Sequence, residues 1–193
     1  MNTILGPDGK KRCAWCGDVP EFIPYHDNEW GFPVTNDIRL FEKICLEGFQ
    51  SGLSWRTILL KRENFREAFA GFDFNKVAMF TEDDVERLLQ NAGIIRHRGK
   101  IEATINNAKR AIEMIEREGS LSNFFWSYEV QENRDKSRST SPESVALSKE
   151  LKKRGWKFVG PTTMYAFMQA MGLVNDHDTN CYIKPLVKNK NTL

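Results

Sequence analysis

The sequence predicts an all-α fold, and three observations support that class. Apolar residues recur three and four positions apart through most of the chain, as they do on one face of a helix. Capping residues precede these stretches, and glycines follow several of them. No stretch shows the convincing alternation of a strand, and no internal repeat occurs. With 193 residues and 40% hydrophobic composition, the chain is expected to form one domain, residues 1–193.

Each expected helix is bounded by recognisable residues. The first follows a capping stretch that includes Asn36, and the second follows Ser54. Thr81 and three acidic residues open the third, where negative charge suits the helix dipole. Gly93 ends the third helix and Gly119 ends the fourth. The expected helices are 37–48, 55–69, 82–92, 99–118, 144–154 and 161–173, with a shorter helical segment at 121–128.

The composition is that of an ordinary soluble protein. No run approaches the roughly 20 apolar residues of a membrane-spanning helix, and residues 1–11 show no apolar signal segment, so we expect a cytoplasmic protein with no membrane association. Four cysteines in this context indicate reduced thiols or metal ligands. Residues 131–142 are polar and predict the most mobile loop. A net charge of +2 does not by itself indicate a polyanionic partner.

A basic helical hairpin is expected over about 85–115. Its connector runs from Gly93 to Gly99 and includes Arg96 and Arg98, with Lys100 directly after it. Glycines permit close backbone approach, amides at a helix N-terminus donate to phosphate, and the basic side chains add counter-charge. The spacing alone fits equally well an ordinary helical hairpin with a solvated turn. The basic run at 149–157 is interpreted as a solvated helix face.

Two cysteine and histidine pairs at opposite ends of the chain form a candidate metal site. Cys13 and His26 lie near the N-terminus, and His177 and Cys181 are four residues apart near the C-terminus. Thiolates and imidazoles are the ligands that tetrahedral zinc prefers. An ion held by all four would join segments 10–30 and 173–185. Cys16 offers an alternative to His26, because it forms a local pair with Cys13.

A second constellation combines aromatic side chains with one carboxylate. Trp15, Phe22 and Tyr25 precede a polar motif, and Glu47 and Trp55 follow it. Ring faces that stack and a carboxylate that accepts hydrogen bonds are what a flipped nucleobase needs. The alternative is that the rings belong to the core and Glu47 is a surface residue.

Together these motifs closely resemble the bacterial DNA-3-methyladenine glycosylase I family over nearly the whole chain. The matching segments are Cys13-Ala14-Trp15, Tyr25-His26-Asp27-Asn28-Glu29-Trp30-Gly31, Leu46-Glu47-Gly48, Gly52-Leu53-Ser54-Trp55, Ile94-Ile95-Arg96-His97-Arg98-Gly99-Lys100, Leu151-Lys152-Lys153-Arg154-Gly155 and Leu173-Val174-Asn175-Asp176-His177. The resemblance implies a helix-hairpin-helix glycosylase that acts as a monomer on alkylated double-stranded DNA, without a protein partner. It implies hydrolysis of the N-glycosidic bond of 3-methyladenine, with no lyase step.

The resemblance also implies roles for individual residues. The structural zinc ligands correspond to Cys13, His26, His177 and Cys181. The base pocket corresponds to Trp55 for stacking, Glu47 for recognition of the amino edge and Tyr25 for a further polar contact, with Trp15 and Phe22 nearby. The residues expected to contact DNA are Gly93, Arg96, Arg98, Gly99 and Lys100.

Two departures and two alternatives follow from the same residues. Family members commonly have a tyrosine where this chain has Phe22, so one pocket hydroxyl is missing, and Cys16 competes with His26 as a zinc ligand. A zinc-stabilised DNA-binding protein without catalysis would need no pocket around Glu47. A zinc hydrolase would need an open coordination position, which four protein ligands close. Lys100 invites comparison with lysine nucleophiles, although no neighbouring residue in the sequence activates it.

Overall fold

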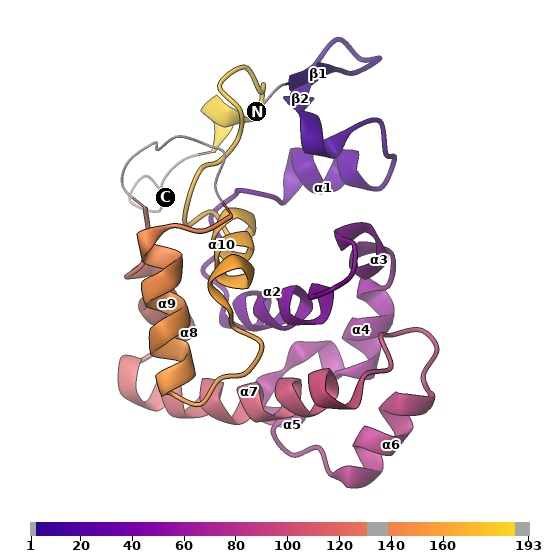
Figure 1. Ribbon diagram of the computed structural model, residues 1–193, viewed down its shortest axis with the longest axis vertical. Coiled ribbons are helices and arrows are strands. Elements are labelled where there is room, and N and C mark those ends of the chain that lie inside the picture. The colour runs from indigo at the N-terminus through magenta and orange to yellow at the C-terminus, as the bar shows by residue number, and fades with distance from the viewer. Residues whose placement is uncertain (1–2, 131–138, 188–193) are drawn as a thin grey trace.

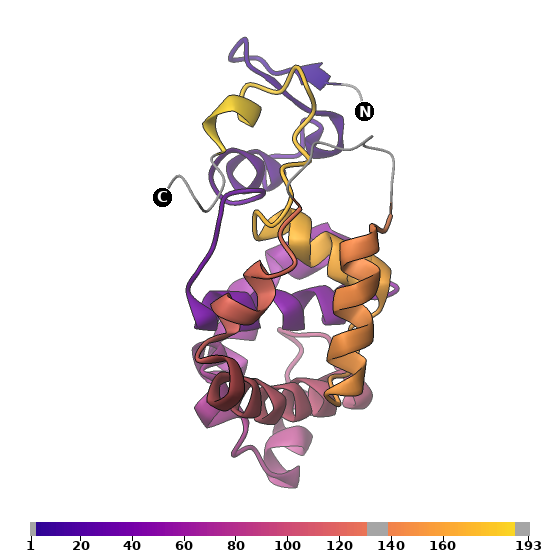
Figure 2. The same ribbon diagram turned by 90° about the vertical axis from the view of Figure 1, so that its left-hand side faces the viewer.

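The computed structural model describes residues 3–130 and 139–187 and is mostly helical. The elements in chain order are β1 (Thr3–Leu5), β2 (Lys11–Cys13), α1 (Phe22–Asn28), α2 (Asp37–Gln50), α3 (Trp55–Leu60), α4 (Arg62–Ala68), α5 (Phe74–Val77), α6 (Glu82–Gln90), α7 (Arg98–Glu118), α8 (Leu121–Trp126), α9 (Pro142–Lys153) and α10 (Pro161–Ala170), with 3-10 turns at Ala14–Cys16, Ala70–Phe72 and Lys184–Leu186. The N-terminal elements and the segment after α10 lie together at one end of the molecule. Helices α6 and α7 lie at the other end, with α2 between (Figures 1 and 2).

The central helix is α2, and its sequence explains its position. The Asn36 side chain caps it by accepting a hydrogen bond from the amide of Arg39 at 3.0 Å. The apolar stripe expected there is confirmed, since Leu40, Phe41 and Ile44 are almost fully buried. Burial of side chains of this size contributes about 1.5–3 kcal/mol each. Helices α3, α7, α8 and α10 all pack against α2, which therefore carries its polar residues into the interior as well.

The helical hairpin expected over about 85–115 is present as α6 and α7. A capping box between Thr81 and Asp84 begins α6. His97 caps α7 by accepting from the amide of Lys100 at 3.2 Å, and α7 ends at Gly119 with a positive φ of 83°. Helix α7 packs against α2, α5, α6 and α8, so its long apolar face covers one side of the core.

Several expected boundaries are wrong for local reasons. Two three-residue strands, too short to show alternation, form an antiparallel hairpin at the N-terminus, so the all-α prediction fails there. Helices α1 and α5 are too short for a clear period. The helix expected over 55–69 breaks at Lys61, whose side chain donates to the carbonyl of Ala92, just before the hairpin connector. Helix α6 ends at Gln90 rather than at 92, and α10 ends at Ala170 rather than at 173. Helix α9 begins at Pro142 rather than at 144, after the capping residue Ser141.

Part of the loop expected to be mobile, 131–138, lies outside the described residues. Within the described ranges, no helix is long and apolar enough to cross a bilayer.

Gly172 allows the end of α10 to pack against the link between α1 and α2. Its φ is +79°, and a Cβ atom at this position would lie 2.6 Å from the backbone nitrogen of Pro33. The amide of Val34 donates to the carbonyl of Met171 beside this contact. The contact fixes the N-terminal segment relative to α10, and both contribute residues to the site described below.

We predict that Gly172→Ala lowers the free energy of unfolding by roughly 1–3 kcal/mol more than Gly71→Ala does, because of steric overlap. Gly71 is a matched control, since its φ is +68° but a Cβ atom there would meet no other atom within 4 Å. The left-handed backbone costs about 1–2 kcal/mol in both variants. Urea denaturation measures the two values, and equal losses would show that the close approach at Pro33 is not tight.

Candidate functional site

Four possible metal ligands converge from the two ends of the chain. Cys13 ends β2 and His26 lies on α1, whereas His177 and Cys181 follow α10. All four side chains are buried, and their ligand atoms lie within 4.8 Å of one another. The Cys181 Sγ atom is 3.4 Å from Nε2 of His26 and 3.6 Å from Nδ1 of His177. Zinc bonds of about 2.3 Å to sulfur and about 2.0 Å to nitrogen imply a tetrahedral separation of about 3.6 Å. The donor set therefore fits one tetrahedral ion.

Hydrogen bonds behind the two histidines orient their rings toward this cluster. Nδ1 of His26 lies 2.8 Å from the Asp27 carboxylate, and Nε2 of His177 lies 2.9 Å from the carbonyl oxygen of Trp30. Because these oxygens accept, the hydrogen-bonded nitrogens carry the protons, and the other nitrogen of each ring presents its lone pair. Burial lowers the pKa of His26, although the hydrogen bond to Asp27 opposes that shift. The neutral imidazole, the form that binds metal, is thereby favoured at His26.

The geometry also distinguishes His26 from Cys16, the alternative candidate for the same ligand position. Cys16 is buried, but its sulfur does not belong to the converging group among the described residues. Burial raises the pKa of the Cys16 thiol to about 11. The set with His26, expected from the sequence, is therefore the one that the fold assembles.

A cavity of about 240 Å³ opens beside the cluster. We call it the base slot because it contains residues that the resemblance assigns to a base pocket. It brings together four residues expected from the sequence and four more. Its lining consists of Trp15, Tyr25, Trp30, Glu47, Gln50, Trp55, Ala166 and Gln169. Within the described residues, the indole nitrogens of Trp15 and Trp55 are buried without a hydrogen-bond partner. The slot thus combines ring faces with one carboxylate.

Phe22 does not line the slot. Its ring contacts Trp15 from α1, with 5.8 Å between the ring centroids, and so supports a wall residue. Gln169 lines the slot from α10 but was not expected, because the pattern of that helix is typical of an apolar core element. Its polar side chain within the apolar 161–173 segment was the signal available in the sequence.

Glu47 is paired with Lys43, which the sequence did not single out. Lys43, one turn earlier on α2, places its Nζ atom 2.7 Å from Oε1 of Glu47 and 2.9 Å from the hydroxyl of Tyr25. The same ammonium lies 3.3 Å from the centroid of the Trp55 ring. Burial lowers the pKa of Lys43, while attraction to Glu47 acts in the opposite direction. A Lys and Glu four residues apart on a helix with an apolar face is the pattern that would have identified the pair.

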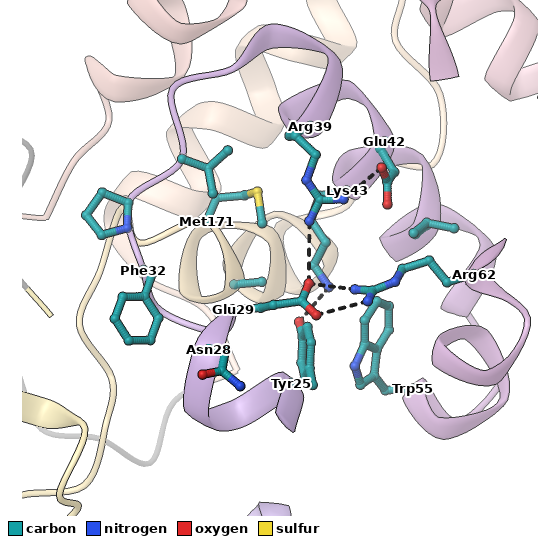
Figure 3. Close-up of a pocket in the computed structure, with 14 residues that line it drawn as sticks. Tyr25, Asn28, Glu29, Phe32, Arg39, Glu42, Lys43, Trp55, Arg62 and Met171 are labelled. Atoms are coloured by element: carbon teal, nitrogen blue, oxygen red, sulfur yellow. Dashed lines mark hydrogen bonds and ion pairs between the residues drawn. The ribbon is translucent and has the colours of Figure 1, made fainter. Parts of the chain in front are cut away.

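A second cavity of about 260 Å³, here called the charged cavity, lies behind Tyr25 and Trp55. Figure 3 shows Glu29 held between Arg39 and Arg62, with Lys43 reaching from α2 toward Tyr25. Arg62 donates to both Glu29 oxygens, at 2.7 and 2.9 Å. Tyr25 and Trp55 line both cavities, so their rings form the partition between the charged cavity and the base slot.

The hairpin residues expected to contact DNA lie in different environments. Arg96 is exposed and has no ion pair with the described residues. Arg98 pairs with Glu82, Glu86 and Glu102 on the hairpin surface. Gly99 lies in the first turn of α7.

The carbonyl group of Gly93 and the side chain of Lys100 face inward from the hairpin. The carbonyl of Gly93 accepts from Asn64, which holds the connector against α4. Lys100 is 8% exposed, and its side chain donates to the carbonyls of Phe49 and Ser51, at 2.9 and 2.6 Å. Lys100 thus satisfies carbonyls at the C-terminal end of α2, next to the rim of the slot.

Comparisons with known proteins agree with this geometry. The sequence model of the Methyladenine glycosylase family matches residues 15–184. DNA-3-methyladenine glycosylase 1 of Escherichia coli is 53% identical over 182 residues, covering 91% of this chain and 97% of the relative. DNA-3-methyladenine glycosylase of Haemophilus influenzae is 49% identical over 181 residues, covering 90% and 97%.

Solved structures lead to the same family. A crystal structure of 3-methyladenine DNA glycosylase I superposes with a TM-score of 0.83 at 54% identity, covering 89% of this chain and 98% of the other. The Staphylococcus aureus 3-methyladenine DNA glycosylase I, from a study of 3-methyladenine recognition, gives a TM-score of 0.86 at 37% identity, covering 93% and 98%. The resemblance seen in the sequence motifs is confirmed, and the chain belongs to the methyladenine glycosylase family.

Proposed function

We propose that this chain removes 3-methyladenine from alkylated double-stranded DNA by hydrolysing the N-glycosidic bond, without a lyase step. The observation that carries the proposal is the base slot, where Tyr25, Glu47 and Trp55 meet at one cavity. Relatives that are 53% and 49% identical are named for this activity. The proposal includes a single-domain, cytoplasmic monomer that needs no protein partner. A DNA-binding protein without catalysis has no use for such a slot.

In this proposal, binding of the alkylated base supplies most of the rate acceleration. Methylation at N3 makes the purine cationic, so it leaves as a neutral base once the bond to the sugar breaks. The flipped base stacks on Trp55, its amino group donates to Glu47, and Tyr25 makes a further polar contact. As the base departs, water adds to the sugar carbon and gives up one proton to solvent, which carries away the positive charge of the alkylated nucleotide. Base binding, DNA distortion and a positioned water supply the acceleration, and Glu47 chiefly recognises the base.

Glu47→Gln is expected to weaken binding of free 3-methyladenine about tenfold or more, since a hydrogen bond to a charged group contributes roughly 1.5–3 kcal/mol. Excision should fall with it. Chromatography of bases released from methylated duplex DNA measures excision. Glu63→Gln is the control, because that side chain is 77% exposed and its ion pair is with Arg66, away from the slot. Full excision and full base affinity in Glu47→Gln would refute the assignment.

We further propose that the Cys13, His26, His177 and Cys181 cluster holds a structural zinc ion. The support is the tetrahedral fit of the buried donor set. Four protein ligands close the coordination sphere, so the ion's contribution is to fasten the segment after α10 to β2 and α1. The reaction takes place in the slot, and the zinc affects the reaction only by fixing the side chains that line the slot.

Cys181→Ser is expected to lose zinc and lower the melting temperature by at least about 4 °C, because a metal ligand that joins two segments contributes folding free energy. Cys16→Ser is the matched control, as Cys16 is also buried but lies outside the cluster. It should keep one zinc per chain. Elemental analysis and calorimetry measure both quantities, and a normal melting temperature in Cys181→Ser would reject the structural role.

For DNA contact we propose the hairpin connector, with Arg96 and Arg98 as phosphate-binding cations and the backbone at Gly93 and Gly99 as the close approach. Arg98 would exchange some of its carboxylate partners for phosphate. Lys100 serves this surface indirectly, by holding the carbonyls at the end of α2. That placement also argues against a lysine nucleophile, because the amine is occupied and faces the interior.

Arg96→Gln is expected to reduce the slope of log affinity against log salt by about 0.9, the value for one phosphate contact on duplex DNA, at unchanged stability. Lys100→Gln should leave that slope unchanged and lower the free energy of unfolding by roughly 1–3 kcal/mol. Fluorescence anisotropy at several salt concentrations and urea denaturation measure these effects. A reduced slope in Lys100→Gln would return Lys100 to the set of phosphate contacts.

A further inference from the structure

Lys43 contacts all three side chains proposed to recognise the base. Its Nζ atom lies 2.7 Å from Oε1 of Glu47, 2.9 Å from the hydroxyl oxygen of Tyr25 and 3.3 Å from the centroid of the Trp55 ring. The residue is 6% exposed. A buried ammonium is unfavourable unless it is well paired, so these contacts define where it can reside.

Lys43 reaches these groups from behind the slot. It lines the charged cavity but not the base slot, whereas Glu47 lines the slot but not the charged cavity. Tyr25 and Trp55 line both. The ion pair therefore lies at the partition, and the slot remains open to a base on the other side. In Figure 3 the Lys43 side chain is seen from the side of the charged cavity.

The chemistry of an ammonium constrains its two partners. Lysine has three donors and no acceptor, so the Tyr25 oxygen must accept from Lys43. The phenolic proton of Tyr25 is then free to point elsewhere and to donate. Lys43 takes one acceptor position on Oε1 of Glu47, and Oε2 lies outside that contact and can accept from a base. Lys43 therefore makes the Tyr25 hydroxyl a donor and leaves the Glu47 carboxylate an acceptor for a molecule in the slot.

We propose that Lys43 is a positioning residue that sets the hydrogen-bond polarity of the base slot, so that the slot favours a base edge with an amino donor beside a ring-nitrogen acceptor. This inference rests on the proposed role of the slot. Lys43 also balances the charge of Glu47, so the slot selects through directed hydrogen bonds more than through net negative charge. The adenine amino edge carries the required pair of groups.

The other charged groups around the pair are already engaged. Glu29 binds Arg62 and Arg39 in the charged cavity, and these three groups, with the Tyr25 phenol, face Lys43 and Glu47 from α1, α2 and α4. Without Lys43, Glu47 would be a buried carboxylate with no direct cationic partner in the part of the chain that the structure describes. Such a group takes up a proton rather than remain charged, and so loses acceptor strength.

The test is calorimetric titration of free 3-methyladenine into the full-length protein from about pH 6.5 to pH 8.5, with the Lys43→Met variant beside the native protein. The native affinity should be nearly constant in this range. Lys43→Met should bind about tenfold or more weakly at the lower pH and recover as the pH rises, because the Glu47 carboxylate reforms. A residue needed only for folding would not produce this pH dependence.

Two further variants keep the result interpretable. Lys43→Gln retains amide donors without the charge, should show the same pH dependence with a smaller loss, and carries the test if Lys43→Met does not fold. Arg39→Met removes a cation that lines the charged cavity but does not contact Glu47, and its pH profile should match the native one.

The outcomes separate this inference from the function on which it rests. If Glu47→Gln loses 3-methyladenine binding while Lys43→Met and Lys43→Gln keep native affinity at every pH, the role of Lys43 is overturned and the slot assignment stands. If Glu47→Gln also binds normally, the slot assignment itself fails and the role of Lys43 fails with it. Weak binding by the Lys43 variants that does not change with pH would reduce Lys43 to a packing role.

Discussion

Pairing of the charges buried on α2 is the constraint on which the rest of the site depends. Glu42, Lys43 and Glu47 all lie inside the molecule, where an unpaired charge is costly. Lys43 and Glu47 pair with each other, and further partners come from other elements: Arg66 on α4 binds Glu42, and Tyr25 on α1 accepts from Lys43. The N-terminal segment is therefore attached to the helical body by polar contacts, and the same contacts orient the slot. Recognition chemistry and fold stability share these side chains.

The metal cluster and the base slot share a wall. The Trp15 ring is 5.5 Å from the His26 ring, and the Trp30 ring is 4.8 Å from the His177 ring, measured between centroids. Both tryptophans line the slot. An ion that fixes the two histidines therefore also fixes two aromatic side chains of the cavity. A metal bound by the cluster would in this way affect the shape of the slot without touching a ligand in it.

Helix ends and candidate ligands could be predicted from the sequence because local signals decide them. Capping at Asn36 and the positive φ at Gly119 agree with helix ends expected from residue type. The four candidate ligands could be identified because few residue types bind zinc and the spacing of these four is distinctive. The direction of a long side chain was harder to predict from the sequence. A lysine at the start of a helix is equally compatible with an exposed phosphate contact and with an inward contact. Tertiary packing turns Lys100 inward instead, toward the carbonyls of Phe49 and Ser51.

The separation of the metal ligands along the chain has a consequence for synthesis. Cys13 and His177 are 164 residues apart, yet their ligand atoms are 3.6 Å apart. A ribosome that has released only the first helices has therefore exposed half of the ligand set without its complement. Closing so long a loop comes late, since contacts between distant residues form after local ones. The two candidate ligands that follow α10 therefore join those of β2 and α1 only after α2 to α10 have been made.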